Sequence, residues 1–238
     1  MRTTPNPGTI HSQCIGLLGG LGVAATVHYY RELVSEHALR DCVPDLVIAH
    51  AEVNRTLRDA AAGHTSALAK YLAEFFHRLS RAGATIGVIP SVTAHICATE
   101  LLERSPIPFV SLPAEVLRDI QLRQLKRVAL MGTRFTIDTD MFAQLPGVEI
   151  VKPKPAEIDA IHDTYVQLAK DGAGTPEQYH RLRALAHTLC NRDRVDAIVL
   201  AGTDLSLIFN PANTDFPHID AVRVHIRAIM RRLFDEPV

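Results

Sequence analysis

The sequence predicts an α/β protein of two similar lobes, each with a mostly parallel sheet flanked by helices, and a pocket between the lobes. Three observations support this prediction. Short apolar runs of strand length alternate with longer segments whose apolar residues recur at helical spacing. Several apolar runs end in turns of glycine, threonine or serine. The same order of elements occurs in both halves of the chain, and strands that alternate with helices favour parallel sheets.

The first half contains four predicted strands. The strand over residues 15–18 runs into the loop GGLG, which contains Gly20. Glycine permits positive φ and close approach of a ligand, but the loop lacks the GxGxxG pattern of a dinucleotide site. A helix over residues 65–82 is predicted to end before Gly83. The predicted strands are 15–18, 45–50, 86–89 and 108–112, the helices are 26–39, 65–82, 93–103 and 114–124, and residues 51–59 are predicted to form a loop.

The second half begins the same order again. Thr175 as N-cap and Pro176 at the first helical position mark the start of one helix. We predict that residues 1–115 together with 215–238 form the first lobe and that residues 116–214 form the second. The predicted strands are 128–131, 148–152 and 196–201, the helices are 138–144, 157–170, 176–192 and 222–234, and residues 217–221 precede the last helix without an assigned element.

Composition excludes several classes of function. A hydrophobic content of 47%, a charged content of 21% and a net charge of −1 provide no basic face for nucleic acid or an anionic membrane. No run reaches the ~18 apolar residues of a membrane span, and no signal-peptide core is present. The four cysteines are dispersed without a CxxC pair, which argues against zinc and a disulfide framework. We predict a cytoplasmic protein that binds no metal.

Two stretches carry most of the candidate chemistry. IPSVTAH follows a strand of the first half and contains Ser91, Thr93 and His95, and LAGTDL follows a strand of the second half and contains Thr203 and Asp204. Ligands of parallel α/β sheets bind at the carboxyl ends of the strands. The two turns are therefore predicted to face each other across one pocket.

Five stretches, in this order, resemble the aspartate/glutamate racemase family: IGLLGGLGVAATVHYYREL, IPSVTAH, MGTRFTIDTDMF, AIVLAGTDLSLI and IDAVRVHIRAIM. The resemblance covers nearly the whole chain. It implies two similar α/β lobes, no cofactor and a homodimer. In the two-base form of the family, cysteines of a CNTAH-like and a GCTE-like turn transfer protons on opposite faces of Cα, because a thiolate is accessible near neutral pH.

This sequence departs from the family at both cysteine positions. Ser91 stands in the first turn and Gly202 in the second. A serine hydroxyl is too weak an acid to ionise near pH 7 unaided, and glycine has no group that transfers a proton. Cys97 and Cys190 lie on or at the end of helices and are expected to be buried structural residues. We therefore expect that two-thiol racemisation does not operate.

The resemblance also suggests groups that hold and transform a substrate. Arg55 and Lys170 match cations that hold the side-chain carboxylate of acidic amino acids; the alternative is that both are exposed surface cations. Asp204 replaces a glutamate and His95 is kept, and either is a candidate for proton transfer, although His95 also fits a buried hydrogen-bonded residue. His225 matches a family histidine of unassigned role. The further expected substrate contacts are Gly20, Val92, Thr93, Thr133, Thr136 and Thr203. Val92 stands where the family usually has asparagine. The threonine hydroxyls would also fit helix caps.

Three hypotheses for function remain open. The first is an enzyme that acts on a small amino acid or dicarboxylate through Ser91, His95, Thr203 and Asp204, by proton removal, decarboxylation or cis–trans isomerisation, with donors that stabilise an enolate. The second is a non-catalytic relative that binds a carboxylate. The third is that Ser91 is an engineered replacement of cysteine, which would restore a one-cysteine enzyme suited to decarboxylation or isomerisation.

Overall fold

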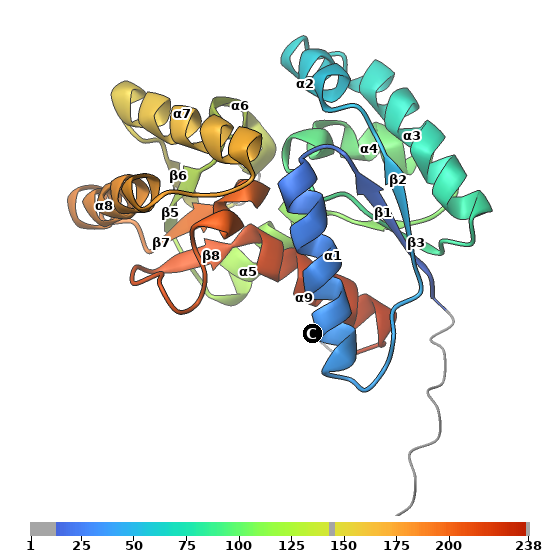
Figure 1. Cartoon of the computed structure of the whole chain (residues 1–238). Helices are drawn as coiled ribbons and strands as arrows, with labels where there is room; N and C mark the ends of the chain where they lie inside the picture. The colour runs from blue at the N-terminus through green and yellow to red at the C-terminus, as the bar shows by residue number, and fades with distance from the viewer. Residues whose placement is uncertain (1–12, 143–145, 237–238) are drawn as a thin grey trace, which may run out of the picture.

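The structure is a computed structural model that describes residues 13–142 and 146–236. Two four-stranded sheets form two lobes, and every strand pair in them is parallel (Figure 1). The strand order is β2-β1-β3-β4 in the first sheet and β6-β5-β7-β8 in the second. The predicted fold class is confirmed, because both halves of the chain build the same kind of sheet.

The bounds of the elements follow the predicted alternation. The first half contains β1 (Ile15–Gly19), α1 (Val23–Ala38), β2 (Leu46–His50), α2 (Val53–Ala61), α3 (Thr65–Arg81), β3 (Ile86–Val88), the 3-10 helix η1 (Thr93–Cys97), α4 (Ala98–Leu102), β4 (Phe109–Val110) and α5 (Leu112–Leu122). The second half contains β5 (Arg127–Met131), α6 (Arg134–Asp138), η2 (Asp140–Phe142), β6 (Glu149–Val151), α7 (Pro155–Asp171), α8 (Pro176–Asp193), β7 (Ala197–Leu200), η3 (Thr203–Leu207), β8 (His218–Asp220) and α9 (Ala221–Leu233).

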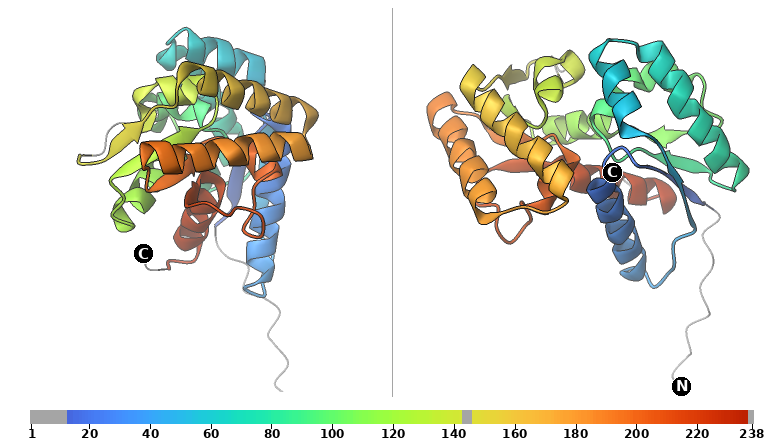
Figure 2. Two further views of the ribbon diagram at one scale, coloured as in Figure 1. Left: turned by 90° about the vertical axis from the view of Figure 1, so that its left-hand side faces the viewer. Right: turned by 45° about the horizontal axis from the view of Figure 1, so that its top comes forward.

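The first sheet is covered by helices on both faces. Strand side chains alternate between faces, so Ile15 and Leu17 pack with α1 and α9, whereas Leu18 packs with α3. All three side chains are completely buried. In the second lobe α7 and α8 lie side by side (Figure 2). Burial on both faces explains why the strands are short uninterrupted apolar runs.

The last helix returns to the first lobe. β8 pairs with β7 in the second sheet, and α9 begins directly after it at the N-cap Asp220. Ile226 and Ile229 then pack with Ile15 and Leu17 of the first sheet. Within the segment 215–238, the strand therefore lies in the second sheet and the helix lies on the first, which ties the two lobes together.

Three predicted elements differ in the structure. Residues 51–59, predicted as a loop, include helix α2, whose N-cap Glu52 accepts a hydrogen bond from the Arg55 amide at 3.2 Å. The helix predicted over 93–103 starts as the 3-10 turn η1 before α4. The helix predicted over 138–144 is shifted to α6 and η2, and its residues 143–144 lie outside the described residues. Among the described helices, none has the length and hydropathy needed to cross a membrane.

We expect His225→Ala to destabilise the protein by about 2–5 kcal/mol. His225 is completely buried; its Nε2–H donates to the Val110 carbonyl at 2.9 Å, and its Nδ1 accepts from the Tyr29 hydroxyl at 2.9 Å. The substitution leaves both partners buried without a hydrogen bond. Urea unfolding measures the effect, with the exposed neighbour Arg223→Ala as control, expected within about 0.5 kcal/mol of the wild type. Equal stability of the two variants would contradict the prediction.

Candidate functional site

A cavity of about 660 Å³ lies between the two lobes, at the carboxyl ends of the strands of both sheets. In Figure 1, α2 and α7 lie on the two sides of this boundary. The residues that line the cavity come from both lobes and from each of the predicted turns. They are Gly20, Leu21, Gly22, Val23, Val53, Asn54, Leu57, Ala61, Ser91, Val92, Thr93, Thr133, Phe135, Thr136, His162, Tyr165, Val166, Ala169, Lys170, Ala201, Thr203 and Asp204.

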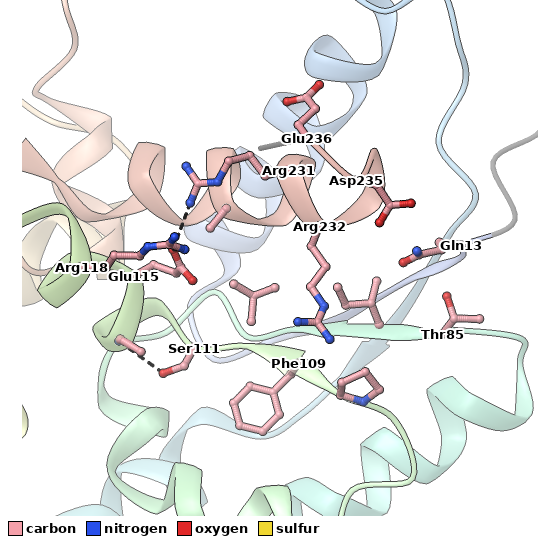
Figure 3. A pocket seen from close by; sticks show the side chains of 15 residues that line it. Gln13, Thr85, Phe109, Ser111, Glu115, Arg118, Arg231, Arg232, Asp235 and Glu236 are labelled. Carbon is pink, nitrogen blue, oxygen red and sulfur yellow. Dashed lines mark hydrogen bonds and ion pairs between the residues drawn. The ribbon is translucent and has the colours of Figure 1, made fainter. Parts of the chain in front are cut away.

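A larger hollow of about 880 Å³ lies at the opposite end of the first sheet, between α5 and the end of α9 (Figure 3). It is open to solvent, and much of its charge is paired. Glu115 lies 3.1 Å from Arg231 and 4.0 Å from Arg118, and Glu236 pairs with Arg40 at 3.1 Å. We take the smaller cavity as the candidate site, because it lies where parallel sheets bind ligands and contains the predicted residues.

Nine of the twelve predicted site residues line the cavity between the lobes. Gly202 lies between the lining residues Ala201 and Thr203 but does not line the cavity itself. Arg55 and His95 also lie outside the lining. The nine that line it are Gly20, Ser91, Val92, Thr93, Thr133, Thr136, Lys170, Thr203 and Asp204.

The ring of Tyr165 fills the space next to Gly202. A Cβ atom added at Gly202 would contact Tyr165 Cε2 and would lie 2.9 Å from Cδ2 and 3.0 Å from Cζ. Contacts of this length do not occur at ordinary Cβ atoms, so a side chain at position 202 and the present Tyr165 rotamer exclude each other. Tyr165 is 9% exposed and belongs to the core of the second lobe. Tyr165 therefore occupies the space that a side chain at position 202 would take.

Asp204 is the most unusual group in the pocket. Its side chain is 3% exposed, and Oδ2 accepts a hydrogen bond from the Tyr165 hydroxyl at 2.8 Å. Oδ1 is buried and makes no hydrogen bond within the part of the chain that the structure describes. Burial raises the pKa of Asp204, while the Tyr165 hydroxyl and the amide of Ala25 act in the opposite direction. A buried polar atom without a partner is rare, so Asp204 Oδ1 calls for a structural or functional explanation.

Asp204 also connects the lobes. Its carboxylate lies against Gly22, the N-cap of α1, where the space for a Cβ atom would be 3.6 Å from Oδ2. The amide of Ala25 in the first turn of α1 acts on the same carboxylate. Free amides and the helix dipole favour negative charge at this end of a helix. One carboxylate of the second lobe is therefore placed by a tyrosine of its own lobe and a helix of the other.

His95 supports the first turn from beneath the pocket. Its Nδ1–H donates to the Ser91 carbonyl at 2.7 Å, and its Nε2 accepts from the Leu112 amide at 3.2 Å. Burial lowers the pKa of His95 to about 4, so the ring is neutral at pH 7. Both ring nitrogens are hydrogen-bonded to backbone groups, so neither is free to transfer a proton in this arrangement. The buried, hydrogen-bonded alternative describes it better.

Ser91 lines the pocket at the first turn, where it is 9% exposed. Its Oγ accepts from the Ala94 amide, in the second residue of η1, at 3.4 Å. The hydroxyl has no contact with a basic side chain in the described structure. The described structure therefore shows no base that would activate this serine.

Arg55 is directed away from the cavity. Asn54 and Leu57 of α2 line the cavity, whereas Arg55 does not. With 3.6 residues per helical turn, Arg55 lies on a different face of α2 from Leu57. Its guanidinium lies 4.0 Å from the centre of the Tyr71 ring and 3.8 Å from Asp59 Oδ2. In this arrangement the Arg55 guanidinium lies outside the cavity lining, because the segment is a helix and not the predicted loop.

Two side chains are exchanged between the lobes at the floor of the pocket. Val92 of the first lobe is 4% exposed and belongs to the core of the second, and Phe135 of the second lobe packs against the core of the first. Both residues line the cavity. This exchange fixes the distance between the turns that carry Ser91 and Asp204.

Three further predicted residues lie at strand ends, and a fourth lies at the end of a helix. Gly20 adopts a φ of +86°, and a Cβ atom there would lie 2.8 Å from His50 Cδ2 and in contact with the Ala51 carbonyl, so only glycine fits. Thr133 caps α6 by accepting the Thr136 amide at 3.1 Å, and the two hydroxyls are 3.0 Å apart. Lys170 lines the rim from the last turn of α7. These hydroxyls form one polar corner of the pocket.

None of the four thiols lines the cavity. Cys97 is completely buried beneath the first turn, and burial raises its pKa to about 12. Burial and the nearby Asp45 raise the pKa of Cys14 to about 11, and burial raises that of Cys190. A thiol with a raised pKa forms little thiolate near pH 7.

Sequence reasoning missed the pocket-facing side of α7. His162, Tyr165, Val166 and Ala169 lie on the same helical face as Lys170, at spacings of three and four residues. The helix and Lys170 were both predicted, so this periodicity was a usable signal. The role of Tyr165 depends on its contact with Asp204, which is 39 residues away in the chain, and no local pattern reveals it.

The fold and this site define a two-lobed α/β protein whose pocket lies between matching strand ends and is bordered by hydroxyl-bearing turns. The family model for Asp/Glu/Hydantoin racemase matches residues 18–229. The chain therefore belongs to the Asp/Glu/hydantoin racemase family.

Solved structures share this fold at low identity. An Asp/Glu racemase candidate from Yersinia pestis has a TM-score of 0.80 at 19% identity, covering 93% of this chain and 99% of that chain. An aspartate racemase homologue from Pyrococcus horikoshii OT3 has a TM-score of 0.78 at 20% identity, with the same coverage of 93% and 99%. A glutamate racemase from Francisella tularensis in complex with D-glutamate has a TM-score of 0.65 at 16% identity, covering 94% and 82%.

We expect Gly202→Ala to cost about 1–3 kcal/mol, because the new methyl group overlaps the Tyr165 ring. The same substitution in a Tyr165→Ala background should cost much less, since the ring is then absent. A double-mutant cycle in urea measures this coupling. Additive effects of the two substitutions would show that the ring and position 202 do not compete for space.

The stability of the protein should depend on the ionisation of Asp204. The pKa of Asp204 is higher in the folded state than in the unfolded state. Between these two pKa values the folded chain therefore binds more protons than the unfolded chain. The free energy of unfolding therefore falls as pH rises from about 4 through the raised value. Asp204→Asn should lack this component, so the wild type should lose stability relative to the variant over that window. Urea unfolding at several pH values tests this, with exposed Asp163→Asn as control; a pH-independent difference would contradict it.

Proposed function

We propose that this protein binds a small amino acid or other carboxylate between its lobes and transfers a proton at the carbon next to the carboxylate, without a thiol or a cofactor. Asp204 is the acid–base group, and Tyr165 positions it. Family membership supports a small amino-acid ligand in this pocket. The observation that carries the proposal is Asp204 Oδ1, which is buried at the pocket without a hydrogen-bond partner among the described residues.

The chemistry follows from the two oxygens of Asp204. Oδ2 accepts the Tyr165 hydroxyl hydrogen bond, and burial raises the pKa of Tyr165, so the phenol remains a donor. Oδ1 is then free to take the Cα proton. The C–H electron pair moves into the substrate carboxylate and forms an enediolate. The raised pKa of Asp204 makes its protonated form a competent donor, and the proton returns to carbon.

Hydroxyl and amide donors at the strand ends fit the developing charge. Ser91 and Thr93 reach the pocket from one lobe and Thr133 and Thr136 from the other. Donors fixed before the reaction stabilise an enediolate more than they stabilise the starting carboxylate. Lys170 at the rim adds one positive charge.

A single buried acid–base group limits the outcome of the reaction. Inversion needs proton donors on both faces of Cα, whereas Ser91 on the first-lobe side is not activated. Exchange of the Cα proton, or its return to a different atom in an isomerisation, needs only Asp204. Decarboxylation is a second candidate, because the protonated Asp204 would supply the one proton that the carbanion needs after loss of carbon dioxide.

Two further properties are part of this proposal. We expect a homodimer, as the resemblance implies, and a cytoplasmic location, as the four dispersed cysteines suggest. Size-exclusion chromatography with light scattering tests the first, and a mass near 26.2 kDa would contradict it.

The test is deuterium exchange at Cα in deuterated water, followed by NMR on L- and D-aspartate, glutamate and neutral amino acids. Wild type should exchange at least one of these substrates, and Asp204→Asn should slow the exchange by about 100-fold or more, because it removes the acid–base group and keeps the shape. Cys97→Ala and Cys190→Ala should retain the wild-type rate, since both thiols lie outside the pocket.

Two results would contradict this proposal. Exchange that persists in Asp204→Asn would remove Asp204 from the mechanism. No exchange and no turnover, combined with a thermal shift caused by one carboxylate, would identify a binding protein instead.

A further inference from the structure

The charges of the interlobe pocket suit one carboxylate better than two. Among the described residues that line it, Lys170 at the rim is the one lysine or arginine, and Asp204 adds a negative charge when ionised. Arg55, expected to hold a second carboxylate, lies against Tyr71 and Asp59. A buried carboxylate without a paired cation is costly. A dicarboxylate would therefore place its second charge beside Asp204 with no guanidinium to compensate.

The walls of the pocket are largely apolar. Leu21, Val53 and Val92 contribute from the first lobe, and Phe135 and Ala169 from the second. A volume of about 660 Å³ falls within the range of about 300–1,000 Å³ typical of small-molecule pockets. The space accommodates an aromatic ring in addition to a carboxylate held at the polar turns.

Three exposed aliphatic side chains surround the mouth of the same pocket. Val23 of α1 is 64% exposed, Leu57 of α2 is 47% exposed and Val166 of α7 is 47% exposed. All three line the cavity, and they come from three different helices. Apolar side chains that converge on one opening are covered favourably by an apolar ligand group.

We propose that the substrate carries one carboxylate and a bulky apolar group, such as an aryl or branched alkyl group, on the carbon from which the proton is removed. The carboxylate lies at the hydroxyl-bearing turns, and the apolar group lies between Leu57, Val166 and Val23. This proposal rests on the proposed function, because it names the substrate class of the same pocket. It replaces the dicarboxylate that the resemblance suggests.

Two matched ligand pairs test the substrate class by isothermal titration calorimetry. The first pair is phenylglycine and aspartate, and the second is 2-phenylpropanoate and 2-methylsuccinate. Each pair differs in whether the carbon next to the carboxylate bears a phenyl or a carboxymethyl group. The phenyl member of at least one pair should bind tenfold or more tightly than its partner.

Two variants locate the preference in the structure. Leu57→Ser and Val166→Ser should each weaken binding of that phenyl ligand about threefold to tenfold and change binding of its dicarboxylate partner by less than twofold. Leu122→Ser is the matched control, because Leu122 is 63% exposed on α5 and lies outside this pocket. It should leave both affinities unchanged.

The outcomes separate this proposal from the proposed function. Equal or tighter binding of the dicarboxylates, or a phenyl preference that survives both serine variants, overturns the apolar substrate class. If a dicarboxylate then exchanges its Cα proton in an Asp204-dependent manner, the proposed function stands without it. If none of the four ligands binds, the apolar substrate class is overturned, and the exchange test on the amino acids decides the proposed function separately.

Discussion

The hydrogen bond from the Tyr165 hydroxyl to Asp204 Oδ2 organises the candidate site. The Tyr165 ring needs the space that a side chain at position 202 would take, so Gly202 is the residue that allows the ring to lie there. The hydroxyl then holds one oxygen of Asp204 and leaves the other buried without a partner in the described structure. One aromatic ring thus accounts for both the glycine and the position of the carboxylate.

The pocket keeps its shape because the lobes share their cores. Val92 packs into the second-lobe core, Phe135 packs against the first-lobe core, and α9 leaves the second sheet to cover the first. His225 of α9 joins Tyr29 of α1 to Val110 of β4 through two hydrogen bonds. Exchanged side chains of this kind resist sliding of one lobe over the other, because close-packed interiors deform little. The two turns therefore face each other at a defined separation.

The polar turns were predictable, and the surrounding helices were less so. Strand ends in parallel sheets converge at one edge, and Gly20, Ser91, Thr133 and Asp204 follow such strands, so they meet in one pocket. Arg55 is different. Its segment is short and polar with only Thr56 and Ala60 buried, so the helix that turns Arg55 towards Tyr71 has a weak local signal.

The contrast between His95 and Tyr165 has the same origin. His95 is a titratable residue in the right turn, but its two ring nitrogens bond to backbone groups of Ser91 and Leu112, the second of which lies beyond β4. Tyr165 is an ordinary helix residue in the sequence, and its contact with Asp204 joins α7 to η3. Hydrogen bonds between distant segments determine which of these polar side chains faces the pocket. The residue type alone does not determine it.

By itself, the sequence determined the alternation of strands and helices, the two lobes, the pocket-bearing turns, and the presence of serine at 91 and glycine at 202. These properties follow from periodicity and local backbone chemistry, which act over a few residues. Only the tertiary structure decided that Tyr165 occupies the space beside Gly202, that Asp204 is buried with one free oxygen, and that Arg55 lies outside the pocket. Each of these depends on packing between segments far apart in the chain, where burial and the space left by neighbours determine the position and the pKa of a side chain.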